Sequence, residues 1–166
     1  MSPFLDLWSW WPQTALVIDR AETADAEDLA TIHGGAFHRG WPADDFVAML
    51  GENAVLAHVI RRRAGAPVAG FVLSRLAADE AEILTVAVDA RLRGRGLAGR
   101  LLAEHVKDLM RAGIRHLFLE VESENAPALK LYARHGFATI GRRKGYYRSA
   151  SGAADAITMR RELPPL

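Results

Sequence analysis

Cysteine is absent from this chain of 166 residues, and its absence excludes several kinds of chemistry. Without a thiol the chain has no disulfide framework, no cysteine nucleophile and no cysteine-ligated metal site. The six histidines lack the H-E-x-x-H spacing or any comparable ligand spacing, so we expect no metal ion. A strong excess of charge is missing as well. The formal net charge of +1 gives no reason to expect DNA or RNA as a primary ligand.

The N-terminal stretch is apolar but lacks the features of a targeting segment. Residues 1–13 contain Trp8, Trp10 and Trp11 but have no positive start, no long apolar core and no small-residue cleavage site. The stretch is also too short to span a bilayer, and we expect no membrane span. We interpret it as an extension that lies on the domain surface, with contact to a partner or a membrane surface as the alternative. Residues 14–166 then form one domain, because half of the chain is apolar and can form a core.

A basic, glycine-rich turn between an apolar strand and an amphipathic helix is the most informative part of the sequence. Val86, Ala87 and Val88 belong to the expected strand, and the turn runs from Gly94 to Gly99. One stripe of the following helix is expected to be buried, formed by Leu97, Leu101, Leu102, Val106 and Leu109. Backbone N–H groups at a helix N-terminus bind anions, and glycines let a pyrophosphate approach the backbone closely. The sequence therefore predicts a phosphate-binding turn.

Two nucleotide-binding motifs are alternatives for this turn. A Walker loop requires Gly-Lys-Ser/Thr after four intervening residues, and the chain has none. Gly94, Gly96 and Gly99 do match the G-x-G-x-x-G dinucleotide fingerprint. That match lies mid-chain, behind several apparent antiparallel strands, and leaves no room for a complete doubly wound sheet. We therefore disfavour it.

The expected elements follow the order βααβββαβαββ. Strands are expected over residues 15–18, 54–62, 68–77, 81–88, 116–121, 137–142 and 156–160. Two helices are expected over residues 21–36 and 41–50. A third is expected directly after the glycine turn, and a fourth over residues 126–135.

The segment Arg93-Gly94-Arg95-Gly96-Leu97-Ala98 reads as R-x-x-G-x-A and resembles the acetyl-CoA motif of the GNAT family of N-acetyltransferases. A frame that starts at Arg91 fits equally well, but the later frame places Leu97 in the apolar stripe and keeps the family's distance from the preceding strand. The resemblance runs from about residue 14 to the end of the chain. It implies an α/β (mixed α+β) GNAT fold with a central mixed, mostly antiparallel sheet, a β-α-β acetyl-CoA-binding core and helices on both faces. The residues that would bind acetyl-CoA are then Val86, Ala87, Val88, Arg93, Gly94, Arg95, Gly96, Leu97, Ala98 and Gly99.

Residues 116–121 form an apolar strand that contains one acidic side chain, Glu120. A strand that follows a crossover helix in a parallel pair is expected to be buried on both faces, so this carboxylate requires an explanation. Glu120 is our candidate for a general base. The alternative is a side chain at a frayed strand end that points to solvent or pairs with a neighbouring arginine.

Asn125 follows this strand and is suited to cap the next helix. Tyr132 comes two helical turns later, near the same face, and would otherwise most often be a core residue. With Glu120 and Gly136-Phe137, these residues match a pattern of the ribosomal-protein-alanine acetyltransferases, L-E-V-x-x-x-N-x-x-x-x-x-x-Y-x-x-x-G-F. The resemblance implies that Glu120 accepts a proton, Tyr132 donates one, and Asn125 contacts the pantetheine arm of acetyl-CoA.

These residue types suit acetyl transfer to an amine. An α-amino group with a pKa of about 8 is mostly protonated at neutral pH, so a carboxylate must take its proton, directly or through water. The carbonyl oxygen becomes an oxyanion, which N–H groups around residues 86–88 can bind if a bulge turns them toward the site. The departing thiolate needs a proton, which a tyrosine can supply. No covalent acyl-enzyme is expected, because the chain has neither a cysteine nor a recognisable serine elbow.

A basic, tyrosine-containing segment over residues 141–147 leads to residues 155–159 near the C-terminus. An ordinary hairpin with solvated basic residues is one interpretation. The segment is also similar to acetyltransferases of protein N-termini, which implies that Tyr146 and Tyr147 hold the first residues of an acceptor peptide. Glu122 and Glu124 depart from the family pattern. This acidic rim favours basic residues downstream of the acceptor alanine.

Together these features predict a cytoplasmic enzyme that transfers acetyl from acetyl-CoA to a protein α-amine, in particular the N-terminal alanine of the eighteenth small-subunit ribosomal protein. We expect a monomer or a weak dimer. Two alternatives stay open. One is a GNAT enzyme that acetylates a free amine such as an amino acid, polyamine or antibiotic, and the other is a noncatalytic acyl-CoA-sensing module.

Overall fold

The computed structural model describes residues 16–149 and 152–166. The tryptophan-rich extension over residues 1–13 lies outside the described residues, so its contact with the domain surface stays a prediction. The helices are α1 (Ala26–Ala36), α2 (Ala43–Leu50), α3 (Leu97–Arg111) and α4 (Ala126–Arg134), with short 3-10 helices at Thr23–Asp25 and Ala90–Leu92. The strands are β1 (Val17–Arg20), β2 (Val55–Arg61), β3 (Val68–Ala77), β4 (Glu80–Val88), β5 (His116–Glu122), β6 (Ala138–Ser149) and β7 (Gly152–Glu162).

This order confirms the βααβββαβαββ prediction. The two C-terminal strands are longer than the expected 137–142 and 156–160, because pairing continues past a bulge in the basic segment. All seven strands form one sheet in the order β1-β2-β3-β4-β5-β7-β6. Its neighbouring pairs are antiparallel except β4 and β5, which are parallel and joined by α3. The sheet is therefore mixed and mostly antiparallel, as the resemblance implied.

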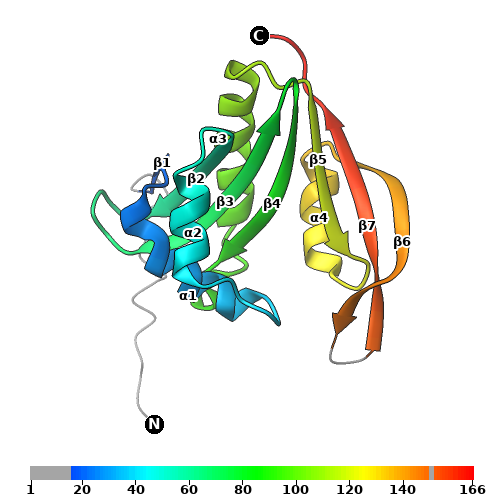
Figure 1. The fold of residues 1–166 in the computed structure, drawn as a ribbon, viewed down its shortest axis with the longest axis horizontal. Helices are drawn as coiled ribbons and strands as arrows, with labels where there is room; N and C mark the ends of the chain where they lie inside the picture. The colour runs from blue at the N-terminus through cyan, green and yellow to red at the C-terminus, as the bar shows by residue number, and fades with distance from the viewer. Residues whose placement is uncertain (1–15, 150–151) are drawn as a thin grey trace.

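Helices cover both faces of the sheet, but unequally. α1 and α2 pack on one face of β2–β4, where Leu29, Phe46 and Phe71 are fully buried. α3 packs on the opposite face, and every residue of its predicted apolar stripe is buried. α4 lies on that second face, where Tyr132 joins the same core. Figure 1 shows α1 and α2 in front of the N-terminal strands, whereas no described helix lies in front of β5, β7 and β6.

None of the helices in the described part of the chain combines the length and the apolar character needed to cross a membrane. The longest, α3, is amphipathic along its fifteen residues, with polar side chains outside the buried stripe. The core therefore accounts for its apolar residues.

Strand β5 corrects one sequence-based expectation. Leu117, Leu119 and Val121 are buried on the side of α3 and α4, but Glu120 lies on the other face, where positions are half-buried. The prediction that this strand is buried on both faces was wrong, because α1 and α2 pack on β2–β4 and do not extend over β5. Glu120 is therefore an acidic residue on a partly exposed face, and its presence in the strand does not require a buried charge.

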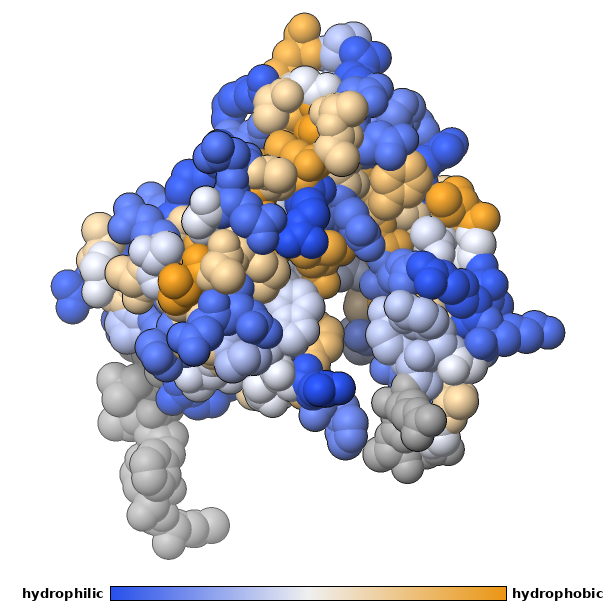
Figure 2. Space-filling model, in the orientation of Figure 1, coloured by the Kyte–Doolittle hydropathy of each residue, from blue (hydrophilic) through white to orange (hydrophobic). Residues whose placement is uncertain are grey.

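The sheet divides between β4 and β5. Parallel pairing joins residues 80–83 of β4 to residues 116–119 of β5 and ends there. At this point Leu84 forms a bulge in β4, since it has no partner in β3. Beyond the bulge the two strands diverge (Figure 1), and the space-filling view shows a hollow between the two halves of the molecule (Figure 2). Residues 84–88 and 120–122 border this space, which we call the opening.

Candidate active site

The glycine turn has the geometry of an anion-binding helix start. Gly94 and Gly96 have φ angles of 75° and 77°, in the left-handed region that favours glycine. No atom of a more distant residue lies within 4 Å of the position that a Cβ would take at either glycine, so this backbone is open to a ligand. α3 begins at Leu97, and the first amides of a helix have no intrahelical acceptor. Arg95 lies between the two glycines, and Ala98 lies in the first turn of the helix.

The absence of a side chain at Gly99 has a structural reason that the sequence did not indicate. This glycine lies inside α3 instead of in the turn. A Cβ at this position would lie 3.2 Å from Nε2 of His135 and 3.8 Å from Cδ1 of Leu131, at the C-terminal end of α4. The missing side chain therefore lets α4 approach the first turn of α3. Contact between Gly99 and acetyl-CoA stays a prediction.

Arg93 braces the turn. Its Nε donates to the carbonyl of Val88 at 3.2 Å, and its Nη2 donates to the carbonyl of Gly35 at 3.2 Å. These bonds join the turn to the end of β4 and the end of α1. Arg91 donates to the carboxylate of Asp89 at 2.8 and 3.1 Å. Both arginines thus have protein partners, and the backbone amides at the start of α3 are the groups best placed for phosphate oxygens.

The tail of β4 supplies backbone groups to the opening. Val86, Ala87 and Val88 pair with β3 on one side, and the parallel pairing with β5 has ended before them. In an antiparallel pair, alternate residues direct their N–H and C=O groups away from the partner strand. The expected bulge is present, but it lies at Leu84, ahead of the three residues it was expected to turn.

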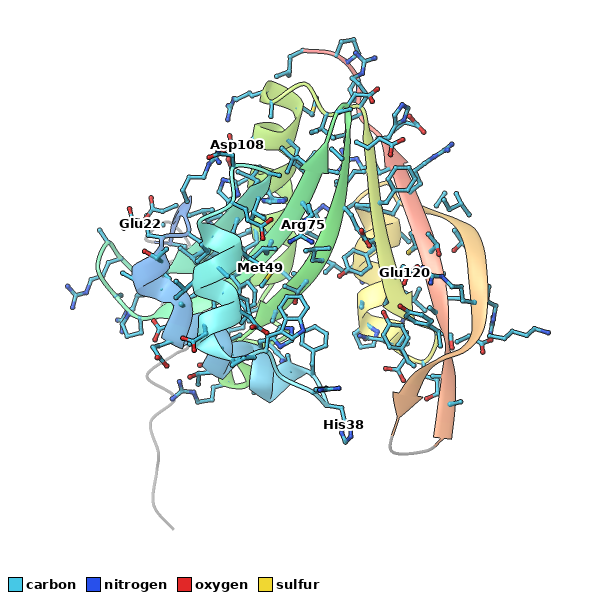
Figure 3. The ribbon with its side chains drawn as sticks, viewed as in Figure 1. Glu22, His38, Met49, Arg75, Asp108 and Glu120 are labelled. Carbon is cyan, nitrogen blue, oxygen red and sulfur yellow. The ribbon has the colours of Figure 1, made fainter. Side chains whose placement is uncertain are left out.

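Glu120 is the first residue of β5 beyond the paired segment, and Figure 3 shows it in the C-terminal half of the molecule. Its side chain is 18% exposed, and its carboxylate accepts a hydrogen bond from the guanidinium of Arg143 on β6. Glu120 therefore has the arginine partner that was expected as the alternative to a catalytic role, and it also lies at the opening. Because β7 lies between β5 and β6, this ion pair spans a strand.

Two tyrosines lie in the same half of the molecule. Tyr132 on α4 is 9% exposed, and its ring packs edge-on against Phe137 with the centroids 5.8 Å apart. Burial raises the pKa of Tyr132 to about 12, with a smaller contribution from Tyr147. Burial also raises the pKa of Tyr147, and the charge of Glu120 adds to that rise. Tyr147 therefore lies within electrostatic range of both Glu120 and Tyr132.

Asn125 has the capping role that its sequence position predicted. Its Oδ1 accepts a hydrogen bond from the amide of Ala128 at 3.2 Å, at the start of α4. The cap fixes where α4 begins after β5. Contact between Asn125 and a pantetheine arm stays a prediction.

The carboxylate of Asp155 shapes the hairpin between β6 and β7. It accepts hydrogen bonds from the amide of Gly145 at 2.9 Å and from Nε of Arg142 at 2.5 Å, and these bonds lower the pKa of Asp155. β6 bulges at this point, where Gly145 has a φ angle of 64°. The bulge leaves Tyr146 55% exposed while Tyr147 is half-buried, and their rings are perpendicular with centroids 5.3 Å apart. Both tyrosines therefore lie on the same hairpin as the partner of Glu120.

Comparisons with known proteins agree with this geometry. The sequence pattern of the acetyltransferase (GNAT) family matches residues 26–137, which is more than half of the chain. The chain belongs to the GNAT family of acetyltransferases. The N-alpha-acetyltransferase RimI of Mycobacterium tuberculosis is 38% identical over 145 residues, which cover 84% of this chain and 87% of that protein.

Two further relatives of this GNAT acetyltransferase come from Escherichia coli. The ribosomal protein bS18-alanine N-acetyltransferase of strain K12 is 33% identical over 143 residues, which cover 86% of this chain and 94% of that protein. The crystal structure of the ribosomal-protein-S18-alanine N-acetyltransferase has a TM-score of 0.83 at 28% identity and covers 91% of this chain and 96% of that chain. The family and the fold that the resemblance implied are therefore confirmed.

The GNAT acetyltransferase also contains a buried row of hydrogen-bonded polar side chains that no sequence pattern predicted. The Nδ1 atoms of His58 and His105 lie 2.8 Å apart, and Nε2 of His105 lies 2.7 Å from Oγ of Ser74. Nε2 of His58 lies 3.0 Å from Oδ2 of Asp108, which Figure 3 shows well apart from Glu120. Burial lowers the pKa of His105 to about 3 and also lowers the pKa of His58. One signal was available, because His105 falls on the predicted stripe of α3.

Proposed function

We propose that this GNAT acetyltransferase transfers the acetyl group of acetyl-CoA to the N-terminal α-amine of a protein, with the N-terminal alanine of the eighteenth small-subunit ribosomal protein as its main acceptor. The observation that carries the proposal is the position of Glu120, at the opening and beside the tyrosine-bearing hairpin. The names of the relatives from Mycobacterium tuberculosis and Escherichia coli support an α-amine of a ribosomal protein as the acceptor. Such a reaction would take place in the cytoplasm, where ribosomal proteins are made.

The residues around the opening fit acetyl-CoA. We assign its pyrophosphate to the amides of the turn at Gly94 and Gly96, whose backbone is open. The pantetheine arm would follow the β4 tail toward Asn125, which brings the thioester between the tail and Glu120. Acetyl-CoA supplies an activated acyl group on a sulfur leaving group.

The proposed reaction is a direct attack of the acceptor nitrogen on the thioester carbonyl, in which a C–N bond forms and the C–S bond breaks. Glu120 takes the proton of the acceptor ammonium, directly or through water, and this frees the nitrogen lone pair. Backbone amides of the β4 tail bind the oxyanion as it develops. Tyr132 gives its proton to the sulfur as the thiolate leaves. The acylated nitrogen releases its remaining surplus proton to water as the amide forms, and Glu120 and Tyr132 then return to their starting protonation states by exchange with water.

The buried position of Tyr132 suits a group that must hold its proton until the last step. A pKa of about 12 keeps the phenol protonated at any working pH. The same shift opposes early donation, because a free thiol has a pKa of about 8.5. Proton transfer from Tyr132 to the thiolate therefore requires that desolvation in the enzyme complex raise the pKa of that thiol as well.

Mass spectrometry of a defined peptide tests the proposed function. A peptide with the first residues of the ribosomal protein, beginning with alanine, is incubated with the enzyme and acetyl-CoA, and fragmentation locates the modified nitrogen. We expect one acetyl group on the α-nitrogen and none on a control peptide whose N-terminus is blocked. A higher kcat/KM for free amino acids or polyamines than for the peptide would replace the protein acceptor with a small amine. No binding of acetyl-CoA or CoA in calorimetry would overturn the proposal entirely.

A further inference from the structure

The base assigned to the reaction already has a cationic partner in the protein. Arg143 on β6 donates from its guanidinium to Oε1 of Glu120 on β5, although β7 lies between the two strands. Ala156 of β7 lies opposite Arg143 and is completely buried, and Thr158 lies opposite Glu120, so only short side chains occupy the strand beneath this crossing. The long arginine side chain can therefore reach over β7.

A second contact holds the same guanidinium. The Cζ atom of Arg143 lies 4.6 Å from the centroid of the Tyr146 ring, within the range of a cation–π interaction. The side chain of Arg143 is nevertheless 56% exposed, whereas the side chain of Glu120 is 18% exposed. The arginine thus covers the carboxylate from the solvent side and can leave without disturbing the core.

An acceptor amine arrives as an ammonium ion, because its pKa of about 8 lies above neutral pH. It must approach Glu120 with a positive charge, which is the charge that Arg143 already brings to this carboxylate. Two cations cannot both take the same hydrogen-bonding position on Oε1. An acceptor that binds at Oε1 therefore competes with the internal ion pair.

We propose that Arg143 is a positioning residue that acts as an exchangeable counter-ion. It holds the carboxylate of Glu120 at the opening in the free enzyme and gives up its place to the ammonium of the acceptor. This inference rests on the proposed function, because it takes Glu120 as the base. The exchange lowers the apparent affinity of every acceptor by one common factor, set by the fraction of enzyme in which the pair is open.

Steady-state kinetics of Arg143→Gln test this role with two acceptors, the alanine-led peptide and alanine amide. We expect KM to fall for both acceptors by the same factor, about fivefold, which corresponds to ~1 kcal/mol at 1.4 kcal/mol per tenfold change. We expect kcat to stay within about threefold, because the reacting groups remain. Arg143→Lys keeps the charge and should return KM toward the native value.

Lys144→Gln is the matched control, since it removes one positive charge from the same hairpin next to Arg143. Its KM for both acceptors should stay within about twofold of the native value, as for a surface charge. A purely structural role for Arg143 predicts the opposite result for Arg143→Gln, a raised KM or a lowered kcat. Either result, or a fall in KM for only one of two acceptors that are both acetylated, overturns the proposal.

A readout without turnover separates this proposal from the proposed function. The side-chain N–H signals of isotope-labelled arginine report the pair by NMR, and the Arg143 signal is assigned by its loss in Arg143→Gln. We expect this signal to shift in Glu120→Gln and also when peptide or alanine amide is added to the native enzyme. If the peptide is not acetylated at all but KM for alanine amide falls about fivefold in Arg143→Gln, the acceptor assignment fails and the role of Arg143 stands. If neither amine moves the signal, the proposal for Arg143 fails whatever the acceptor.

Discussion

The two halves of the sheet treat ionisable side chains in opposite ways. In the N-terminal half, β2–β4 are covered by helices on both faces, and His105 and Ser74 are completely buried within their hydrogen-bonded chain. In the C-terminal half, β5 is covered on one face only, and Glu120 remains partly exposed at the opening. Polar side chains are therefore part of the core where helices cover both faces of the sheet. Where helices cover only one face, a polar side chain is accessible to a substrate.

The largest effect should come from the open half, with Glu120→Gln. We expect kcat to fall about 10²-fold or more, because an amide cannot accept the proton of the acceptor. Calorimetric binding of acetyl-CoA should be retained, since the turn at Gly94 and Gly96 is unchanged. Glu82→Gln makes the same chemical change on the exposed face of β4, within its paired segment, and should keep native turnover. Equal kcat values for the two variants would remove Glu120 from the mechanism.

Tyr132→Phe tests whether burial and a catalytic role can occur together, because Tyr132 is a buried group in the open half of the sheet. We expect kcat to fall about a hundredfold through loss of the proton donor. In the native enzyme, burial raises the pKa of Tyr132 to about 12, so the phenol is protonated below that pH. A spectrophotometric titration of tyrosinate should therefore lose its last-titrating component in Tyr132→Phe. A tyrosine that titrates near pH 10 at this position would contradict the burial argument.

The same Gly-to-Ala change should have unequal costs in the two halves. A Cβ at Gly70 on β3 would lie 3.0 Å from the carbonyl oxygen of Ala87 and 3.3 Å from Cδ1 of Leu101, so the covered half has no room for it. We expect Gly70→Ala to lower the free energy of unfolding by about 1–3 kcal/mol in urea denaturation. At Gly141 on β6, the nearest atom is Cβ of Thr158 at 3.8 Å, and the cost should stay within about 0.5 kcal/mol. Equal costs would mean that the two halves are packed alike.

The smallest predicted effect is an acid-dependent loss of stability from the histidine pair. Burial lowers the pKa of folded His105 to about 3 and also lowers that of His58, whereas an unfolded histidine has a pKa of about 6.5. Between about pH 6.5 and 3 the unfolded chain binds protons that the folded chain does not, so stability falls as the pH falls. The slope approaches ~1.4 kcal/mol per pH unit for each fully shifted histidine.

Urea denaturation at pH 7.5 and 5.5 measures this effect against His105→Gln. The variant should show a smaller loss between the two pH values, by about 1 kcal/mol, because it removes one of the titrating groups. The comparison with the native protein cancels His33, whose pKa burial also lowers, to about 4. An unchanged pH dependence in the variant would show that folded His105 has the pKa of an unfolded histidine and that this half is not closed to water.

The sequence predicted most of the fold because its patterns are local. The stripe of α3 follows from helical spacing, the bounds of β3 from an apolar run between turn signals, and the cap at Asn125 from its place before Pro127. The sequence did not predict that one face of β5 is open. This exposure depends on where α1 and α2 pack, and the residues of β5 do not determine that position. The site was predicted in the same uneven way. Glu120 and Tyr132 belong to a recognisable pattern, and their roles stay predictions.

The partners of the predicted residues could not be read from the chain. Arg143 reaches Glu120 from 23 positions away and across another strand. Arg93 carries a motif position yet is bound to two carbonyl groups, because the fold brings Gly35 beside the turn. Gly99 is small because α4 approaches it, a contact that requires both helices to be in place. These are long-range consequences of the topology, whereas the motifs are short-range.

The hydrogen bond between His105 and Ser74 has a consequence for the far end of its helix. Leucine contacts tolerate some rotation of a helix about its own axis, but a hydrogen bond has a direction and fixes that rotation. His105 lies eight residues after Leu97, so the bond sets the azimuth of amides about 12 Å away. The direction of the N–H groups in the first turn of α3 is thus determined inside the molecule, by the buried imidazole of His105.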